Sequence, residues 1–316
     1  MTENTVTFAD IQSAAKMIAP LVLRTPVMTC ETINALVGRE LFFKCEHLQK
    51  VGAFKYRGAS HAVARLSAAQ KKNGVCTHSS GNHAQALALA AKQQQMPAYI
   101  LMPETAPRVK VDSVRGYGAE ITFCEPTQSA REETARIIVE QTGATFIHPF
   151  DNSHVIAGQG TAALELLEEI PDLDAIICPV GGGGLASGTC LAAHGINPDV
   201  KIFAAEPEGA DDTFRSFQSG ERQTVGIPDT IADGLLTSVG ELTWPILKQH
   251  LSDVLTVDDD QITSAMQLLW SRMKQVVEPS GAVPLAAILN HDLPNDLKKI
   301  GVILSGGNID LNKLTW

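Results

Sequence analysis

Aromatic residues are scarce in this 316-residue chain, apolar runs of membrane-spanning length are missing, and acidic residues outnumber basic ones. Because aromatic residues make up only 5% of the sequence, aliphatic side chains must fill most of the core. The formal net charge of −10 argues against binding to nucleic acid or to an anionic membrane surface. With no membrane span and no signal peptide in view, we expect a globular chain without nucleic-acid or membrane partners.

Paired cysteine motifs are also missing. The six cysteines lie apart in apolar surroundings, and none forms the C-x-x-C pair of a zinc or redox site. Reduced, buried thiols are typical of a reducing compartment, so the sequence predicts a cytoplasmic protein.

Short apolar runs alternate with helix-period segments from about residue 74 onward. We expect strands at 74–78, 98–102, 120–125, 144–148, 174–180, 201–206 and 300–305. We expect helices at 82–95, 106–117, 129–141, 154–169, from 185, and at 259–275. This alternation predicts an α/β fold with parallel sheets covered by helices.

The pattern changes near residue 150, after a compact run of strand–helix units. One further strand is expected at 41–48, before that run begins. We therefore expect a small α/β domain at 70–148, inserted into a large domain formed by 1–69 and 149–316. A cleft between the two domains is the expected ligand site.

Four consecutive glycines, Gly181, Gly182, Gly183 and Gly184, separate an expected strand from an expected helix. Bare backbone at a helix start suits a phosphate, although a flexible turn would have the same composition. The spacing Gly181-x-Gly183-x-x-Ala186, with Glu206 at the end of the next strand, also fits a relaxed dinucleotide fingerprint. An NAD-dependent oxidoreductase is therefore a second interpretation.

Polar loops follow two other strands. The segment Ser79–His83 precedes an alanine-rich helix, where its hydroxyls, amide and helix-start N–H groups would bind a carboxylate; helix capping is the alternative. Ser305 follows the last strand, as a presented hydroxyl or as part of a simple turn.

Lys55 lies between Phe54 and Tyr56, where apolar neighbours would lower its pKa and make it a nucleophile. A lysine, a phosphate cradle and a carboxylate receptor together describe a pyridoxal phosphate enzyme acting on amino acids.

Five motifs carry a family resemblance: GAFKYRGA, SSGNHAQAL, GGGGLASG, EPSGAVPLAA and LSGGN, in that order. The chain resembles the fold-type II pyridoxal phosphate enzymes, and within them the serine racemases, serine/threonine dehydratases and threo-3-hydroxyaspartate dehydratases. The resemblance implies two open, mostly parallel twisted sheets flanked by helices, as in the tryptophan synthase β-like fold. The cofactor would lie in the cleft between the large and small domains.

The resemblance also implies roles for the matched residues. Lys55 would bind the cofactor as a Schiff base and take the α-proton, and Ser80 would be the acid/base on the opposite face of the substrate. The expected cofactor-binding residues are Phe54, Lys55, Asn82, Gly181, Gly182, Gly183, Gly184, Leu185 and Ser305. The expected substrate-binding residues are Ser79, Ser80, Gly81, Asn82 and His83.

A metal site is implied in the same way. Carboxylates spaced as in EPEGADD suit Mg²⁺, Mn²⁺ or Ca²⁺, although a solvated acidic loop would look alike. In the enzymes that the chain resembles, a divalent cation is held by the equivalents of Glu206, the Ala210 carbonyl and Asp212. The resemblance further implies a homodimer. Activation by ATP is not expected, because Glu31 would repel a phosphate at the interface site that serine racemase uses.

The leading hypothesis is a β-elimination that converts L-serine, L-threonine or threo-3-hydroxyaspartate to a 2-oxo acid and ammonia, with serine racemase as a side activity. The resemblance implies that Ser305 faces the pyridine nitrogen of the cofactor, where a hydroxyl would favour prompt loss of the substrate's β-hydroxyl. A substrate with a β-carboxylate would need a cation such as Arg131 nearby. The alternatives are a primary serine or aspartate racemase, the oxidoreductase built on Gly181–Ala186 and Glu206, and a non-catalytic amino-acid sensor.

Overall fold

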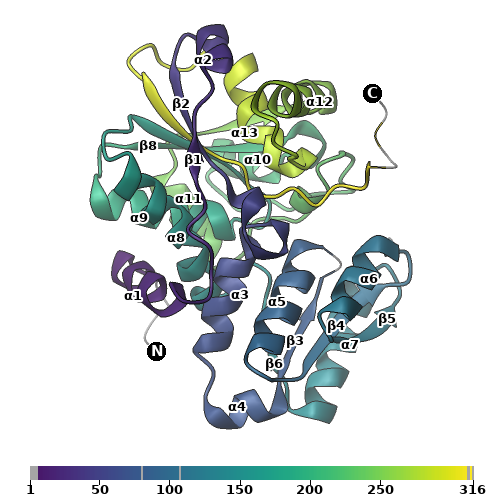
Figure 1. Cartoon of the computed structure of the whole chain (residues 1–316). Coiled ribbons are helices and arrows are strands. Elements are labelled where there is room, and N and C mark those ends of the chain that lie inside the picture. Colours follow the sequence, from purple (N-terminus) through teal and green to yellow (C-terminus); the bar gives the residue numbers. More distant parts are fainter. Residues whose placement is uncertain (1–5, 80, 107, 312–313, 315–316) are drawn as a thin grey trace.

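The strands form two separate sheets in the computed structural model, which describes residues 6–79, 81–106, 108–311 and 314 (Figure 1). The six-stranded sheet has the order β1-β2-β10-β7-β8-β9, and the four-stranded sheet has the order β5-β4-β3-β6. Every strand pair is parallel except β1 with β2. The expected fold class, two mostly parallel sheets flanked by helices, is confirmed.

The strands of the six-stranded sheet are β1 (Val27–Met28), β2 (Glu40–Lys44), β7 (Ala175–Pro179), β8 (Lys201–Pro207), β9 (Asp253–Val257) and β10 (Lys299–Ile303). Those of the four-stranded sheet are β3 (Val75–His78), β4 (Ala98–Pro103), β5 (Glu120–Cys124) and β6 (Thr145–Phe146). The central strands are buried along nearly their whole length, as parallel strands covered on both faces should be.

Helices cover both sheets (Figure 1). The α-helices are α1 (Phe8–Ile18), α2 (Glu31–Val37), α3 (Lys55–Ala64), α4 (Ala68–Asn73), α5 (Asn82–Gln93), α6 (Arg108–Gly116), α7 (Gln128–Thr142), α8 (Ser153–Glu169), α9 (Gly184–Ile196), α10 (Asp212–Ser219), α11 (Thr243–His250), α12 (Asp259–Leu268) and α13 (Pro279–Asn290). Short 3₁₀ turns occur at η1 (Glu46–Leu48), η2 (Lys50–Gly52), η3 (Glu208–Ala210) and η4 (Asp233–Leu235), and a π turn at η5 (Leu269–Met273). Within the described residues, no helix has the length and apolarity needed to cross a bilayer.

Several expected elements differ from the structure at their ends. The strand expected at 41–48 stops at Lys44, because the chain turns into η1 and buries Glu46 in an ion-paired cluster. The strand expected at 144–148 is only two residues long, since it is an edge strand. The helix expected at 259–275 is α-helical only as far as Leu268, and its last turn is a π turn. Helix α3, which begins at Lys55, is not among the expected helices.

Helix α8 packs closely against both α3 and α9 through glycines. A Cβ on Gly158 would lie 2.6 Å from the Cα of Gly58 in α3. A Cβ on Gly160 would lie 2.8 Å from the carbonyl oxygen of Gly188 in α9. The segment IAGQG is therefore a contact surface on which two other helices sit. It fixes the start of α3, which carries Lys55, relative to α9, which follows the four glycines.

A cluster of buried charges lies beneath the start of α3. The fully buried Arg57 makes ion pairs of 2.7 Å with both Glu46 and Glu165. Glu165 also pairs with the buried Lys44 at 2.7 Å. Because each charge has an opposite partner and further hydrogen bonds, the cluster is tolerated in the interior and links β2, α3 and α8.

Candidate active site

The expected functional residues lie mostly at the carboxyl ends of parallel strands, where ligands bind in open α/β sheets. The tetraglycine follows β7, and Ser305 follows β10 by two residues. The Ser79–His83 loop follows β3 in the other sheet. The N–H of Phe54 donates to the Ser305 carbonyl at 3.0 Å, which brings the start of α3 beside the end of β10.

Lys55 sits at the N-terminus of α3 with its amine facing the chain that joins the two sheets. Its Nζ donates to the Pro149 carbonyl at 3.0 Å and lies 5.2 Å from the centre of the Phe54 ring. Burial lowers the pKa of the Lys55 amine to about 8, although the carboxylate of Glu278 opposes this shift. A lysine with this pKa is neutral in roughly a tenth of the molecules at pH 7, far more often than an ordinary lysine, and can attack an aldehyde.

The tetraglycine forms the turn from β7 into α9 and is buried. Gly183 has a φ of 87°, which favours glycine, and a Cβ on Gly182 would lie 2.2 Å from the Phe150 ring. Thr243 Oγ1 donates to the Gly182 carbonyl at 2.8 Å and holds the loop in place. The loop therefore offers backbone N–H groups at a helix start and carries no side chains of its own. This arrangement fits a phosphate group, and Leu185 continues it into α9.

Asn82 is held by a residue that the sequence analysis gave no role. Its Nδ2 donates to the buried carboxylate of Glu278 at 2.8 Å, and its Oδ1 accepts from Asn308 Nδ2 at 2.8 Å. Glu278 also accepts from the Asn308 backbone N–H at 2.9 Å. Burial, together with the charge of Asp233, raises the pKa of Glu278 to about 7. Glu278 opens the motif EPSGAVPLAA, which marks the segment but not the contact.

The Ser79–His83 loop leads into α5, and Gly81 N–H donates to Ser79 Oγ at 3.4 Å. Burial holds the pKa of His83 well below its usual range, and its Nε2 lies 3.3 Å from the Ile147 carbonyl. His83 Nδ1 is buried and without a hydrogen-bond partner in the described part of the chain. Ser80, the expected second acid/base, lies outside the described residues. The described part of this loop therefore places polar groups at the start of α5.

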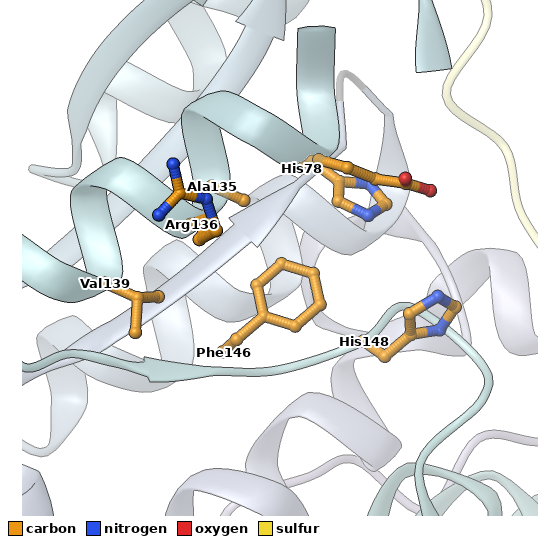
Figure 2. A pocket seen from close by; sticks show the side chains of 7 residues that line it. His78, Ala135, Arg136, Val139, Phe146 and His148 are labelled. Carbon is orange, nitrogen blue, oxygen red and sulfur yellow. The ribbon is translucent and has the colours of Figure 1, made fainter. Parts of the chain in front are cut away.

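Two histidines that the sequence analysis did not single out lie beside this loop. His78 is the last residue of β3, and His148 directly precedes Pro149. Together with Phe146 and residues of α7 they line a cavity of about 350 Å³ (Figure 2). Burial lowers the pKa of His148 to about 4, so this ring is neutral at physiological pH. Nothing in the linear sequence relates β3, β6 and α7 at this point.

Glu206 and Asp212 are both buried near the Ala210 segment. The Glu206 carboxylate accepts the N–H groups of Thr213 and Phe214, at 3.3 and 2.6 Å. Because this carboxylate is buried and engaged at the start of α10, it is not free to bind a ribose as the oxidoreductase interpretation requires. One carboxylate oxygen of Asp212, Oδ1, is buried and accepts no hydrogen bond from the described residues.

An activated lysine and a backbone phosphate cradle at the carboxyl edge of one sheet, with a polar loop at the carboxyl edge of the other, define a cofactor-dependent enzyme of the fold-type II class. Residues 18–306 match the family described as "Pyridoxal-phosphate dependent enzyme", and the chain belongs to this family. This membership confirms the resemblance drawn from the five motifs.

Individual relatives are similar over almost their whole length. The chain is 54% identical to a serine racemase from Dictyostelium discoideum, over 98% of this chain and 97% of the relative. It is 49% identical to a beta-hydroxyaspartate dehydratase from Paracoccus denitrificans, over 98% of both chains. The crystal structure of a pyridoxal 5'-phosphate-dependent aspartate racemase superposes with a TM-score of 0.94 at 41% identity, covering 100% of both chains. The relatives thus include both racemases and a dehydratase.

Proposed function

We propose that this enzyme catalyses β-elimination from a small hydroxyamino acid, with serine racemase as a side activity. The candidate substrates are L-serine, L-threonine and threo-3-hydroxyaspartate, each of which would give a 2-oxo acid and ammonia. The observation that carries the proposal is the buried Lys55 amine with a pKa of about 8, held at the same sheet edge as the glycine cradle. The identity to a beta-hydroxyaspartate dehydratase supports elimination as the main reaction.

The residues fit pyridoxal 5'-phosphate because the chain supplies a buried amine for its aldehyde, a glycine turn without side chains of its own for its phosphate, and the amide of Asn82. Once bound, the cofactor supplies an electron sink that stabilises negative charge at the substrate Cα. Lys55 binds it covalently and then moves the α-proton, which its low pKa permits near neutral pH. Gly181–Gly184 and Leu185 bind the phosphate, Phe54 packs beside the ring, and Ser305 donates or accepts at the pyridine nitrogen.

The substrate carboxylate is bound by the Ser79–His83 loop at the start of α5. Loss of water from the hydroxyamino acid, followed by hydrolysis, returns that water and releases ammonia, so the net products are one 2-oxo acid and one ammonia. In the racemase reaction Ser80 returns a proton to the face opposite Lys55. A primary racemase is the second candidate, and the identity to a serine racemase favours it.

We also propose a divalent cation, Mg²⁺ or alternatively Mn²⁺ or Ca²⁺, at Glu206, Asp212 and the Ala210 carbonyl. Two buried carboxylates and an orphaned buried oxygen on Asp212 fit a hard cation. Among the described residues no group of three or more His, Cys, Asp or Glu side chains could hold a metal, so backbone and water oxygens would complete this site. Added Mg²⁺ should raise the unfolding temperature, and Asp212→Asn should abolish that increase.

The domain division, the oligomeric state, the response to ATP and the cellular compartment are also proposals. Residues 70–148 would move as a small domain against 1–69 and 149–316, and two chains would form a homodimer. Activation by ATP is not expected, because Glu31 would repel a phosphate at the interface site that serine racemases use. The six free cysteines suit the reducing cytoplasm.

The proposed function is tested by incubating the purified holoenzyme with L-serine, L-threonine and both threo-3-hydroxyaspartates. The 2-oxo acid and the chirality of the residual amino acid are followed with Mg²⁺ and with chelator. We expect 2-oxo acid from at least one substrate and none from Lys55→Ala. Ser80→Ala should abolish racemisation while it spares elimination from the L-substrate; equal loss of both reactions would refute the role of Ser80. Nicotinamide-dependent turnover without 2-oxo acid would refute the proposal itself.

A further inference from the structure

The tetraglycine loop is held between two residues that come from distant parts of the chain. On one side lies Phe150, because a Cβ on Gly184 would be 3.1 Å from the Phe150 Cα. On the other side, a Cβ on Gly183 would be 2.8 Å from the Cβ of Thr243, whose Oγ1 donates to the Gly182 carbonyl. The position of the loop that would bind the phosphate therefore depends on what fixes Phe150 and Thr243.

Asp151 connects these two residues. It directly follows Phe150, and its carboxylate accepts three backbone N–H groups at the start of α11. Its Oδ2 accepts from Glu241 at 3.0 Å, and its Oδ1 accepts from Leu242 at 2.8 Å and from Thr243 at 3.3 Å. The residue before α11 is Leu242, whose side chain makes no capping hydrogen bond. A carboxylate from 92 positions away therefore takes the place of the missing local cap and binds the free N–H groups of this helix.

The contact is close and suits a carboxylate in particular. Both oxygens of Asp151 accept from N–H donors, so an asparagine would have to turn its NH₂ group towards one of these donors. A Cβ on Gly240 would lie 2.1 Å from Asp151 Oδ1, so a side chain there would displace the carboxylate. The Gly240 N–H donates to Thr243 Oγ1 at 2.8 Å, and this hydroxyl donates in turn to Gly182. Hydrogen bonds thus connect the start of α11, where Asp151 binds, with the glycine loop.

The hydrogen-bond acceptor of Lys55 does not depend on this carboxylate. The backbone N–H groups of Asp151 and Phe150 both donate to Nδ1 of His148, at 2.9 and 3.4 Å, and close a turn. The Pro149 carbonyl within this turn accepts from Lys55 Nζ at 3.0 Å. Because these bonds use backbone atoms of residue 151, they remain when its side chain is replaced. Loss of the carboxylate should therefore disturb the glycine loop and leave the surroundings of the lysine amine in place.

We propose that Asp151 is a positioning residue for the cofactor phosphate. Its carboxylate holds the start of α11 against the glycine loop, so that the N–H groups of the loop keep the geometry that binds a phosphate. It acts through its neighbours, Phe150 and Thr243. The inference rests on the proposed phosphate-binding role of Gly181–Gly184 and adds a residue to that site from outside the loop.

The test measures the Kd of the full-length apoenzyme for pyridoxal 5'-phosphate and for pyridoxal, which has the same ring and aldehyde but no phosphate. Wild type should bind the phosphorylated form more tightly. Asp151→Asn should raise the Kd for pyridoxal 5'-phosphate about tenfold, the effect of losing a hydrogen bond to a charged group, and leave the Kd for pyridoxal unchanged. The matched control is Asp258→Asn, the same change at an exposed carboxylate that caps α12 by accepting from Gln261 N–H at 2.8 Å. It should leave both Kd values unchanged.

Further variants reach the same contact from its other side. Gly240→Ala should reproduce the selective loss, because its Cβ would displace the carboxylate of Asp151. Combining Gly240→Ala with Asp151→Asn should weaken binding no more than the stronger single change, since both act on one contact. Thr243→Val should also show the selective loss, whereas Thr243→Ser, which keeps the hydroxyl, should retain the affinity of wild type. These variants decide the proposal even if Asp151→Asn does not fold.

Inorganic phosphate gives a readout that needs no covalent bond. It should compete with pyridoxal 5'-phosphate for the apoenzyme, and Asp151→Asn should weaken this competition by the same factor as it raises the Kd. An unchanged Kd in Asp151→Asn, or an equal rise for pyridoxal 5'-phosphate and pyridoxal, would overturn the role of Asp151. A wild type that bound the two compounds equally would overturn the phosphate-binding role of the glycines as well. Because no turnover is measured, failure of the proposed elimination reaction would leave this test valid.

Discussion

Replacing Gly158 by alanine should separate α8 from α3 and disturb the lysine that α3 carries. The new Cβ would lie 2.6 Å from Gly58 Cα and 2.8 Å from the Arg57 carbonyl oxygen. Carbon atoms in contact need about 3.5–4.0 Å, so the helices must move apart by roughly 1 Å. Both contacts are with backbone, which cannot rotate away, and such overpacking costs about 3 kcal/mol at the upper end of its range.

Alanine also favours the helical state over glycine by about 1 kcal/mol, which offsets part of this cost. We therefore expect Gly158→Ala to lower the free energy of unfolding by about 2 kcal/mol in chemical denaturation. Because Lys55 is one helical turn from Gly58, a shift of this size should also lower turnover by about 100-fold.

Gly116→Ala is the matched control. Gly116 ends α6, and a Cβ there meets no atom within 4 Å. The substitution should be neutral or stabilise the protein by up to about 1 kcal/mol. If Gly158→Ala had the stability and turnover of wild type, the close packing of α3 on α8 would not be what positions Lys55.

Three further substitutions or conditions test other parts of the site. Arg57→Met should lower the free energy of unfolding by about 3–5 kcal/mol, because it leaves Glu46 buried without its cation. Adding Glu46→Gln should recover part of that loss in the same unfolding assay. The rate at which the apoenzyme binds pyridoxal phosphate should rise with pH and level off above about pH 8, because only the neutral amine of Lys55 attacks the aldehyde. A rate that keeps rising towards pH 10.5 would contradict the lowered pKa. Gly182→Ala should push on the Phe150 ring and raise the Kd for pyridoxal phosphate by about tenfold or more, whereas adding Phe150→Ala should recover part of the affinity in an equilibrium titration.

Features carried by a single stretch of chain could be predicted from the sequence. The tetraglycine lies between a strand and a helix, so its chemistry depends only on local order, and the same holds for the loop before the alanine-rich α5. The alternation of strands and helices gave the fold class for the same reason. Lys55 drew attention through its two aromatic neighbours in the sequence, Phe54 and Tyr56.

Contacts between distant segments could not be predicted in this way. Glu278 holds Asn82 across 196 positions, and no periodicity relates the two residues. The cavity lined by His78, Phe146 and His148 likewise combines the end of β3, the short edge strand β6 and one face of α7. The sequence named Arg131 only as a cation that a β-carboxylate would need, and the burial of its Nε depends on neighbours that the linear sequence does not reveal. The role of Ser80 stays a prediction.

Covalent attachment at Lys55 can be measured by adding pyridoxal phosphate to the protein, reducing with borohydride and mapping the modified peptide. We expect one pyridoxyl group per chain on the peptide that contains Lys55, and none when Lys55 is replaced by alanine. A pyridoxyl group on a different lysine, or no incorporation at all, would contradict the assignment of this amine and every role derived from it.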